Sequence, residues 1–132
     1  MLIDFDRFVI SCKLAYRRCG GSENNAYSMK DVLWVFRYYF ETYELIFNEP
    51  HPMISVQQIA NIIEKMPIVD DGPEDIDNIE LTPEDYETLI DQHFVTKYKG
   101  CDYNINHFFS GCIRKMRYFE TLYYEEEKEI EP

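Results

Sequence analysis

At 132 residues the chain has the size of one domain, and a core of that size removes roughly two-thirds of the unfolded chain's surface from water. Hydrophobic residues make up 45% of the sequence and aromatic residues 16%, which excludes an intrinsically disordered chain. The net charge of -12 argues against nucleic-acid binding through the whole surface, because that binding depends on Lys and Arg displacing counterions from phosphate.

The sequence predicts a cytoplasmic protein with no membrane partner. No run approaches the roughly 18 apolar residues of a membrane span. The opening segment, MLIDFDRFVISCK, carries acids where a secretory signal carries bases. A core of this size needs no disulfide, so four reduced thiols are expected: Cys12, Cys19, Cys101 and Cys112.

The first predicted helix begins after Asp4, whose side chain can cap it, and ends at Gly20 and Gly21. Ser28 caps a second and longer helix, with Asp31 in the capping-box position. This helix carries two apolar stripes, which predicts burial on two sides and a central place in the fold. The first stripe is Val32, Val35, Phe36, Tyr39, Phe40, Tyr43, Ile46 and Phe47, and the second is Trp34, Tyr38 and Leu45.

Two further helices are predicted beyond the proline-containing segment NEPHP. Ser55 and Gln58 form a capping box for the first, whose inward positions are Ile59, Ile62, Ile63 and Met66. Thr82 and Pro83 mark the start of the second, whose inward positions are Tyr86, Leu89, Ile90, His93 and Phe94. Between them we expect an acidic loop with a short extended piece over 76–81.

Asp102 or Asn104 can cap the last predicted helix, which then runs without a break as far as Tyr123. Helical spacing assigns its inward positions as Ile105, Phe108, Phe109, Cys112, Ile113, Met116, Phe119 and Tyr123. The basic residues Arg114, Lys115 and Arg117 are then expected to project from the flanks and the opposite face. Gly111 is expected to let another helix approach closely.

These segments predict an all-α, single-domain bundle of about five helices, with no convincing alternating strand. The helical domain is expected over 1–124, with the acidic loop between its third and fourth helices. Residues 125–132 form an acidic tail that is expected to fray into solvent.

The strongest functional signal is a block of carboxylates, because 67–96 contains ten acids and no Lys or Arg. No register of this block gives the Gly and Glu spacing of a calcium-binding EF-hand. A solvated surface is its simplest interpretation. The functional hypothesis is that it binds a basic protein partner, because fixed negative charge is complementary to Lys and Arg clusters. We therefore predict a non-enzymatic interaction protein without a cofactor, whose acidic face is Asp70, Asp71, Glu74, Asp75, Asp77, Glu80, Glu84, Asp85 and Glu87.

The same interaction protein is also expected to be able to self-associate, as a homo-oligomer, through leftover aromatic surface. An alternative uses another surface: the chain is an accessory nucleic-acid-binding protein, with Arg114, Lys115 and Arg117 on phosphates and Tyr118 stacking on a base. The helices on either side of the acidic loop are too far apart in sequence for a helix-turn-helix.

A metal or thiol enzyme is a further hypothesis. It requires His93 and His107 to meet with Asp91 or Cys101, by analogy with ligands borne on helices in bundle cores. The sequence has neither HExxH nor CxxC, and the cysteine spacings match no zinc pattern. Structural histidines and core cysteines explain the same residues, so we predict no catalytic residue and no metal site.

The segments AYSMKDVLWVFRYYFETYE, TPEDYETLIDQHFVTKY and CDYNINHFFSG resemble a group of small proteins carried by mobile elements and conjugative transposons of Firmicutes. The resemblance covers most of residues 5–123 and involves no catalytic motif. It implies a bacterial, mobile-element setting and no particular mechanism. In that setting, small acidic helical proteins are expected to be accessory factors in replication or transfer, or inhibitors of host defence such as anti-CRISPR proteins.

Overall fold

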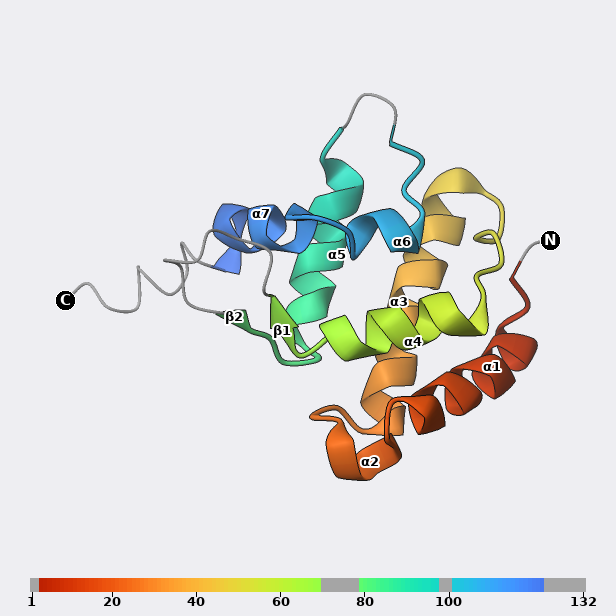
Figure 1. Ribbon diagram of the computed structural model, residues 1–132. Helices are drawn as coiled ribbons and strands as arrows, with labels where there is room; N and C mark the ends of the chain where they lie inside the picture. The colour runs from red at the N-terminus through yellow and green to blue at the C-terminus, as the bar shows by residue number, and fades with distance from the viewer. Residues whose placement is uncertain (1–2, 70–78, 98–100, 123–132) are drawn as a thin grey trace.

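The computed structural model describes residues 3–69, 79–97 and 101–122, and it confirms a mostly helical chain. Within these residues there are seven helices, rather than the five expected, and one small two-stranded ladder (Figure 1). None of the described helices is long and apolar enough to cross a membrane. The elements are α1 Phe5–Arg18, α2 Gly21–Asn24, α3 Met29–Phe47, α4 Val56–Lys65, β1 Ile68–Val69, β2 Ile79–Glu80, α5 Asp85–Val95, α6 Ile105–Phe108 and α7 Ile113–Glu120.

The first three long helices begin where the sequence predicts. The Asp4 side chain accepts a hydrogen bond at the start of α1, and the Ser28 hydroxyl accepts one from the Asp31 N–H at 3.1 Å at the start of α3. At α4 the capping box is complete, since the Ser55 N–H donates to Gln58 Oε1 at 2.8 Å and the Gln58 N–H donates to Ser55 Oγ at 3.1 Å. These caps satisfy N–H groups that the first helical turn leaves without partners.

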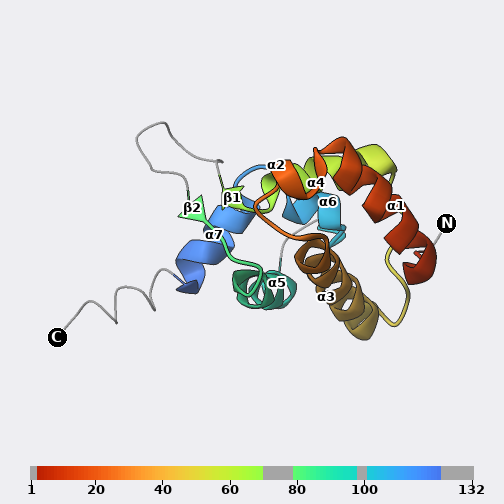
Figure 2. The ribbon, with the colours of Figure 1, turned by 90° about the horizontal axis from the view of Figure 1, so that it is seen from below.

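The core forms where α3 packs against α1 on one side and α5 on the other, while α4 packs against α1 (Figures 1 and 2). Phe8 of α1 packs edge-on against Phe36 and Phe40 of α3, at ring-centroid distances of 4.9 and 5.0 Å. On the other side of α3, Tyr39 lies 5.0 Å from Phe94 of α5. Edge-on and tilted aromatic pairs of this kind add to the gain from burying the rings.

Helix α3 buries most of one apolar stripe and leaves the other partly exposed. Of the first stripe, the residues up to Tyr43 are buried, while Ile46 and Phe47 at its end are exposed. On the second stripe Trp34 is 38% exposed, Tyr38 is half-buried against the core and Leu45 is 81% exposed, so burial on the second side is only partial.

A small antiparallel ladder connects α4 to α5, where the sequence predicts only an extended piece over 76–81. Strand β1 pairs with β2, with Ile68 opposite Glu80. Beyond β2, the Thr82 N–H donates to Asp85 Oδ2 at 2.7 Å and the Asp85 N–H donates to Thr82 Oγ1 at 3.4 Å. These bonds join Thr82 to the first residue of α5, but the helix begins at Asp85 with Glu84 as its N-cap, later than the predicted start at Thr82 and Pro83. The central part of the predicted acidic loop, 70–78, lies outside the described residues.

The predicted unbroken helix over 104–123 is wrong, because α6 and α7 are separate helices. Asn104 begins α6 as predicted, with its side chain accepting the Asn106 N–H at 2.9 Å. The chain then turns through Gly111, whose φ of 52° lies in the left-handed region. Nothing lies within 4 Å of a Cβ placed on Gly111, so the glycine makes the turn and does not admit a neighbouring helix.

The break changes which face of the following helix points inward. A new helix starting at Ile113 is free to adopt a different rotation from the one that α6 would have continued. As a result Cys112 and Met116, expected in the core, are exposed, whereas Arg114 and Arg117, expected outside, are buried. The predicted outward direction of these two arginines is therefore wrong.

Replacing Gly111 with alanine is expected to lower the free energy of unfolding by about 1 kcal/mol, because a Cβ is strained at positive φ even where space is open. Chemical denaturation measures the change. Gly111→Asn is the matched control, since Asn tolerates this conformation, and it should lose less. An alanine variant as stable as the parent would show that the turn does not need a glycine.

His51 is a buried core residue that the sequence does not single out. One ring nitrogen, Nδ1, lies 2.6 Å from the Pro52 carbonyl oxygen, and the other, Nε2, accepts the Ile105 N–H at 2.9 Å. The ring also packs against Phe40 and Tyr43, at centroid distances of 4.9 and 4.8 Å. Because Nε2 must accept and Nδ1 must donate, the neutral ring fits this position and joins the loop after α3 to the start of α6.

Candidate functional site: an acidic and aromatic face on α3 and α5

Helices α3 and α5 lie side by side and run in the same direction (Figures 1 and 2). Across this pair the Tyr38 hydroxyl donates to Asp91 Oδ1 at 2.7 Å. Further along, Phe47 at the end of α3 lies 6.5 Å from Phe94 near the end of α5. The hydrogen bond between Tyr38 and Asp91 therefore joins the second stripe of α3 to the outer side of α5.

The outer residues of α5 are acidic. Glu84, Glu87 and Asp91 are all exposed, and their spacing of three and four residues puts them on one side of the helix. On α3 the half-exposed ring of Trp34 stacks on Tyr38 with centroids 5.4 Å apart. We call these five residues, Trp34, Tyr38, Glu84, Glu87 and Asp91, the acidic–aromatic face.

The carboxylates of this face act on the tyrosine hydroxyl beside them. Burial raises the pKa of Tyr38, and the hydrogen bond to Asp91 and the negative charges of Asp91 and Glu87 raise it further. The hydroxyl therefore keeps its proton and remains a donor to Asp91. The hydrogen bond from the Tyr38 hydroxyl to Asp91 therefore places a carboxylate of α5 against the rings of α3.

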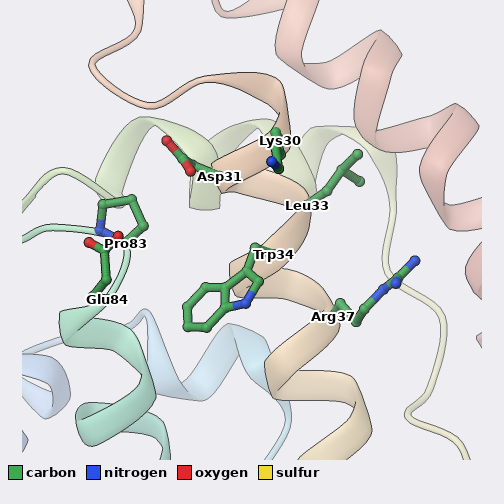
Figure 3. Close-up of a pocket in the computed structure, with 7 residues that line it drawn as sticks. All are labelled: Lys30, Asp31, Leu33, Trp34, Arg37, Pro83 and Glu84. Carbon is green, nitrogen blue, oxygen red and sulfur yellow. The ribbon is translucent and has the colours of Figure 1, made fainter.

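At the α3 start of this face the surface is hollowed, with a volume of about 680 Å³ (Figure 3). Trp34 lies in the middle of the view. Pro83, Glu84 and Asp31 lie on one side of its indole ring, and Lys30, Leu33 and Arg37 lie on the other. The guanidinium carbon of Arg37 lies 4.6 Å from the centre of the Phe5 ring, so this cation is held toward α1. The acids and the bases of the hollow therefore occupy different sides.

Four residues of the predicted acidic block fall within the described part of the chain. Glu80, Glu84 and Glu87 are exposed, whereas the Asp85 carboxylate accepts the Thr82 N–H and serves as a cap. The other predicted members lie outside the described residues: Asp70, Asp71, Glu74, Asp75 and Asp77. Trp34, Tyr38 and Asp91 were not predicted as members of a binding surface. The second apolar stripe of α3 was the signal for the two rings, and it was interpreted as core.

The predicted nucleic-acid contact is not an exposed basic patch. Arg114 is 1% exposed, and its Nη1 donates to the Lys65 carbonyl oxygen at 2.6 Å and to the Tyr86 hydroxyl at 3.1 Å. Arg117 is fully buried, and its Nη1 donates to Thr96 Oγ1 and to Glu120 Oε2, both at 2.7 Å. Lys115 and Tyr118 are half-buried. The two arginines tie α7 to its neighbours and present no guanidinium to a phosphate.

The structure brings the histidines of the enzyme hypothesis together in an aromatic environment. The rings of His93 and His107 lie 6.3 Å apart, and the Phe108 ring lies 5.0 Å from His93. Burial lowers the pKa of His93 to about 4, with further lowering from the charges of Arg117 and His107. Cys101 Sγ accepts the Tyr103 N–H at 3.3 Å. Among the described residues, no three His, Cys, Asp or Glu side chains are grouped as a metal ion requires.

No family model, no curated protein and no solved structure matches the chain. The candidate site therefore depends on the contacts and charges of its own residues.

Proposed function

We propose that the chain is a non-enzymatic interaction protein that binds a basic protein segment along the acidic–aromatic face. The observation that carries this proposal is the pairing of a partly exposed stripe on α3 with exposed carboxylates on α5 and its N-cap, joined by the hydrogen bond between Tyr38 and Asp91. Exposed rings supply apolar contact area, and tryptophan and tyrosine are enriched at the energetic centres of protein interfaces. Carboxylates beside them attract and orient a positively charged partner.

The dimensions of the face fit a helical partner. The second stripe of α3 extends from Trp34 to Leu45, a length of about 16 Å at the rise of an α-helix. Val95, which is 71% exposed, lies at the α5 end of the same face. A basic amphipathic helix of about three turns can pack its apolar side on the stripe and place its basic side against the acids of α5.

Charge distinguishes this partner from the alternatives. A nucleic acid would bring its phosphates against Glu84, Glu87 and Asp91, which repel them, and binding would gain nothing from counterion release there. A second copy of the chain docked through the same face would place like charges opposite each other. A basic protein segment satisfies both the rings and the acids.

The mobile-element setting implied by the sequence resemblance is part of the proposal. In that setting the basic partner belongs to the replication or transfer machinery of the element, or to a host-defence system that the protein inhibits. A small acidic protein that occupies a basic surface acts by competing with whatever that surface normally binds.

Charge reversal tests the proposal. The probe is a synthetic helix of about three turns, with leucine on one side and lysine on the other. We expect the variant Glu84→Lys/Glu87→Lys to bind it at least roughly tenfold more weakly than the parent protein in calorimetric titration, with the difference shrinking at high salt. The matched control is Glu23→Lys/Glu49→Lys, which makes the same change in net charge at exposed positions elsewhere. Equal weakening in both variants would mean that the face has no special role.

A further inference from the structure

We infer that the hollow at the α3 start of the acidic–aromatic face binds an arginine side chain of the partner. The inference rests on the proposed function and adds which residue type the site selects. Its basis is the arrangement in Figure 3, where one exposed indole is bordered on one side by two carboxylates and a proline.

The residues on the acidic side match the parts of an arginine side chain. A guanidinium group is planar and weakly hydrated, so it stacks on an indole and still donates to carboxylates in its own plane. Trp34 supplies the indole, and Asp31 and Glu84 supply the carboxylates. Pro83, on the same side of the indole, supplies apolar surface for the methylene stem. A lysine ammonium is more strongly hydrated and makes no planar stack, which predicts selectivity for arginine.

The basic side of the hollow predicts an effect of the opposite sign, because a positive charge there opposes the binding of arginine. Lys30 borders the hollow, while Arg37 is held over Phe5. A bound guanidinium would be repelled by the Lys30 ammonium across a partly solvated space. Removing that positive charge should therefore strengthen arginine binding, whereas it should weaken the binding of any phosphate-bearing ligand.

The chain offers a direct optical reporter, because Trp34 is its single tryptophan. Tryptophan fluorescence is followed while Nα-acetyl-arginine amide, the matching lysine amide and the matching citrulline amide are added in turn. We expect a saturable change with arginine, at least roughly tenfold weaker binding of lysine, and no saturation with neutral citrulline, which keeps the shape but loses the charge. Adenosine monophosphate is the fourth ligand, and we expect no saturation with it.

Two variants complete the experiment. Glu84→Gln should weaken arginine binding roughly tenfold, and Lys30→Ala should strengthen it roughly twofold to threefold. Glu23→Gln is the control for net charge and should leave binding unchanged. Equal binding of arginine and citrulline, preferential binding of the mononucleotide, or an unaltered affinity in Glu84→Gln would each overturn the inference.

This outcome can be separated from a failure of the proposed function. The leucine and lysine helix contains no arginine, so its binding tests the charge of the face without testing selectivity for arginine. If that helix binds in a charge-dependent way while arginine amide does not, the arginine inference fails and the proposed function stands. If arginine amide binds but the helix does not, the hollow is a cation site and the longer face has no role.

Discussion

Replacing Arg114 with alanine is expected to lower the free energy of unfolding by about 3 kcal/mol. The buried guanidinium donates to the last turn of α4 through the Lys65 carbonyl and to α5 through the Tyr86 hydroxyl. It also lies 5.0 Å from the centre of the Phe109 ring. Truncation removes these bonds together and leaves a cavity among the three helices. Urea denaturation followed by far-ultraviolet circular dichroism measures the change.

Two companion variants identify the cause of that loss. Arg114→Met keeps most of the volume without the donors, so we expect it to lie between the parent and the alanine variant. Arg18→Ala removes an exposed arginine from the end of α1 and should change the free energy of unfolding by less than about 0.5 kcal/mol. If Arg114→Ala were no more destabilising than Arg18→Ala, the buried network would not hold α7 in place.

Acid is expected to destabilise the fold through its two fully buried histidines. Burial lowers the pKa of His93 from an ordinary value of 6.5 to about 4, and burial also lowers the pKa of His51. The folded state therefore binds fewer protons than the unfolded state over this range. The stability that His93 contributes is complete above about pH 6.5 and is lost as the pH falls to about 4. At about 1.4 kcal/mol per pKa unit, the loss from His93 is about 3 kcal/mol.

Urea denaturation at a series of pH values measures this dependence. The comparison is between the parent and His93→Gln, in which the titrating group is absent. We expect the variant to be less stable at neutral pH, because it loses the aromatic packing, but to have a shallower decline between pH 6.5 and 4. Parallel declines in the two proteins would mean that other groups account for the acid sensitivity.

Features that depend on neighbouring residues in the chain could be predicted from the sequence. Ser55 and Gln58 form their capping box from residues three apart, and no other part of the fold is needed to specify it. The inward side of α5, including Leu89 and Ile90, follows from the helical repeat alone. The general class of the fold follows from adding such local signals together.

Features that depend on distant parts of the chain could not be predicted from the sequence. The sequence predicts one helix through Gly111, since nothing in the spacing of the apolar residues shows that the chain will turn there. After the turn, the burial of Arg114 depends on the carbonyl of Lys65 and the hydroxyl of Tyr86, which are far away in sequence. The accepting nitrogen of His51 similarly meets the Ile105 N–H only in the folded chain.

The candidate site was predictable in part for the same reason. The carboxylates of Glu84 and Glu87 stand out in the sequence as members of an interval without bases. The aromatic residues of the face do not stand out as surface residues in the sequence. Trp34 and Tyr38 follow a helical repeat that describes a buried stripe and a partly exposed stripe equally well. Only the arrangement of α3 beside α5 shows that the second stripe remains at the surface.

The central claim is that a basic partner binds at the acidic–aromatic face, and its location can be measured directly. Backbone amide NMR signals of the parent protein are followed while the leucine and lysine helix is added. The account predicts that the largest shifts cluster on α3 from Trp34 to Leu45 and on α5 from Glu84 to Val95, with little change on α1 and α4. Shifts centred on α7, or spread evenly over all the acidic surface, would contradict it.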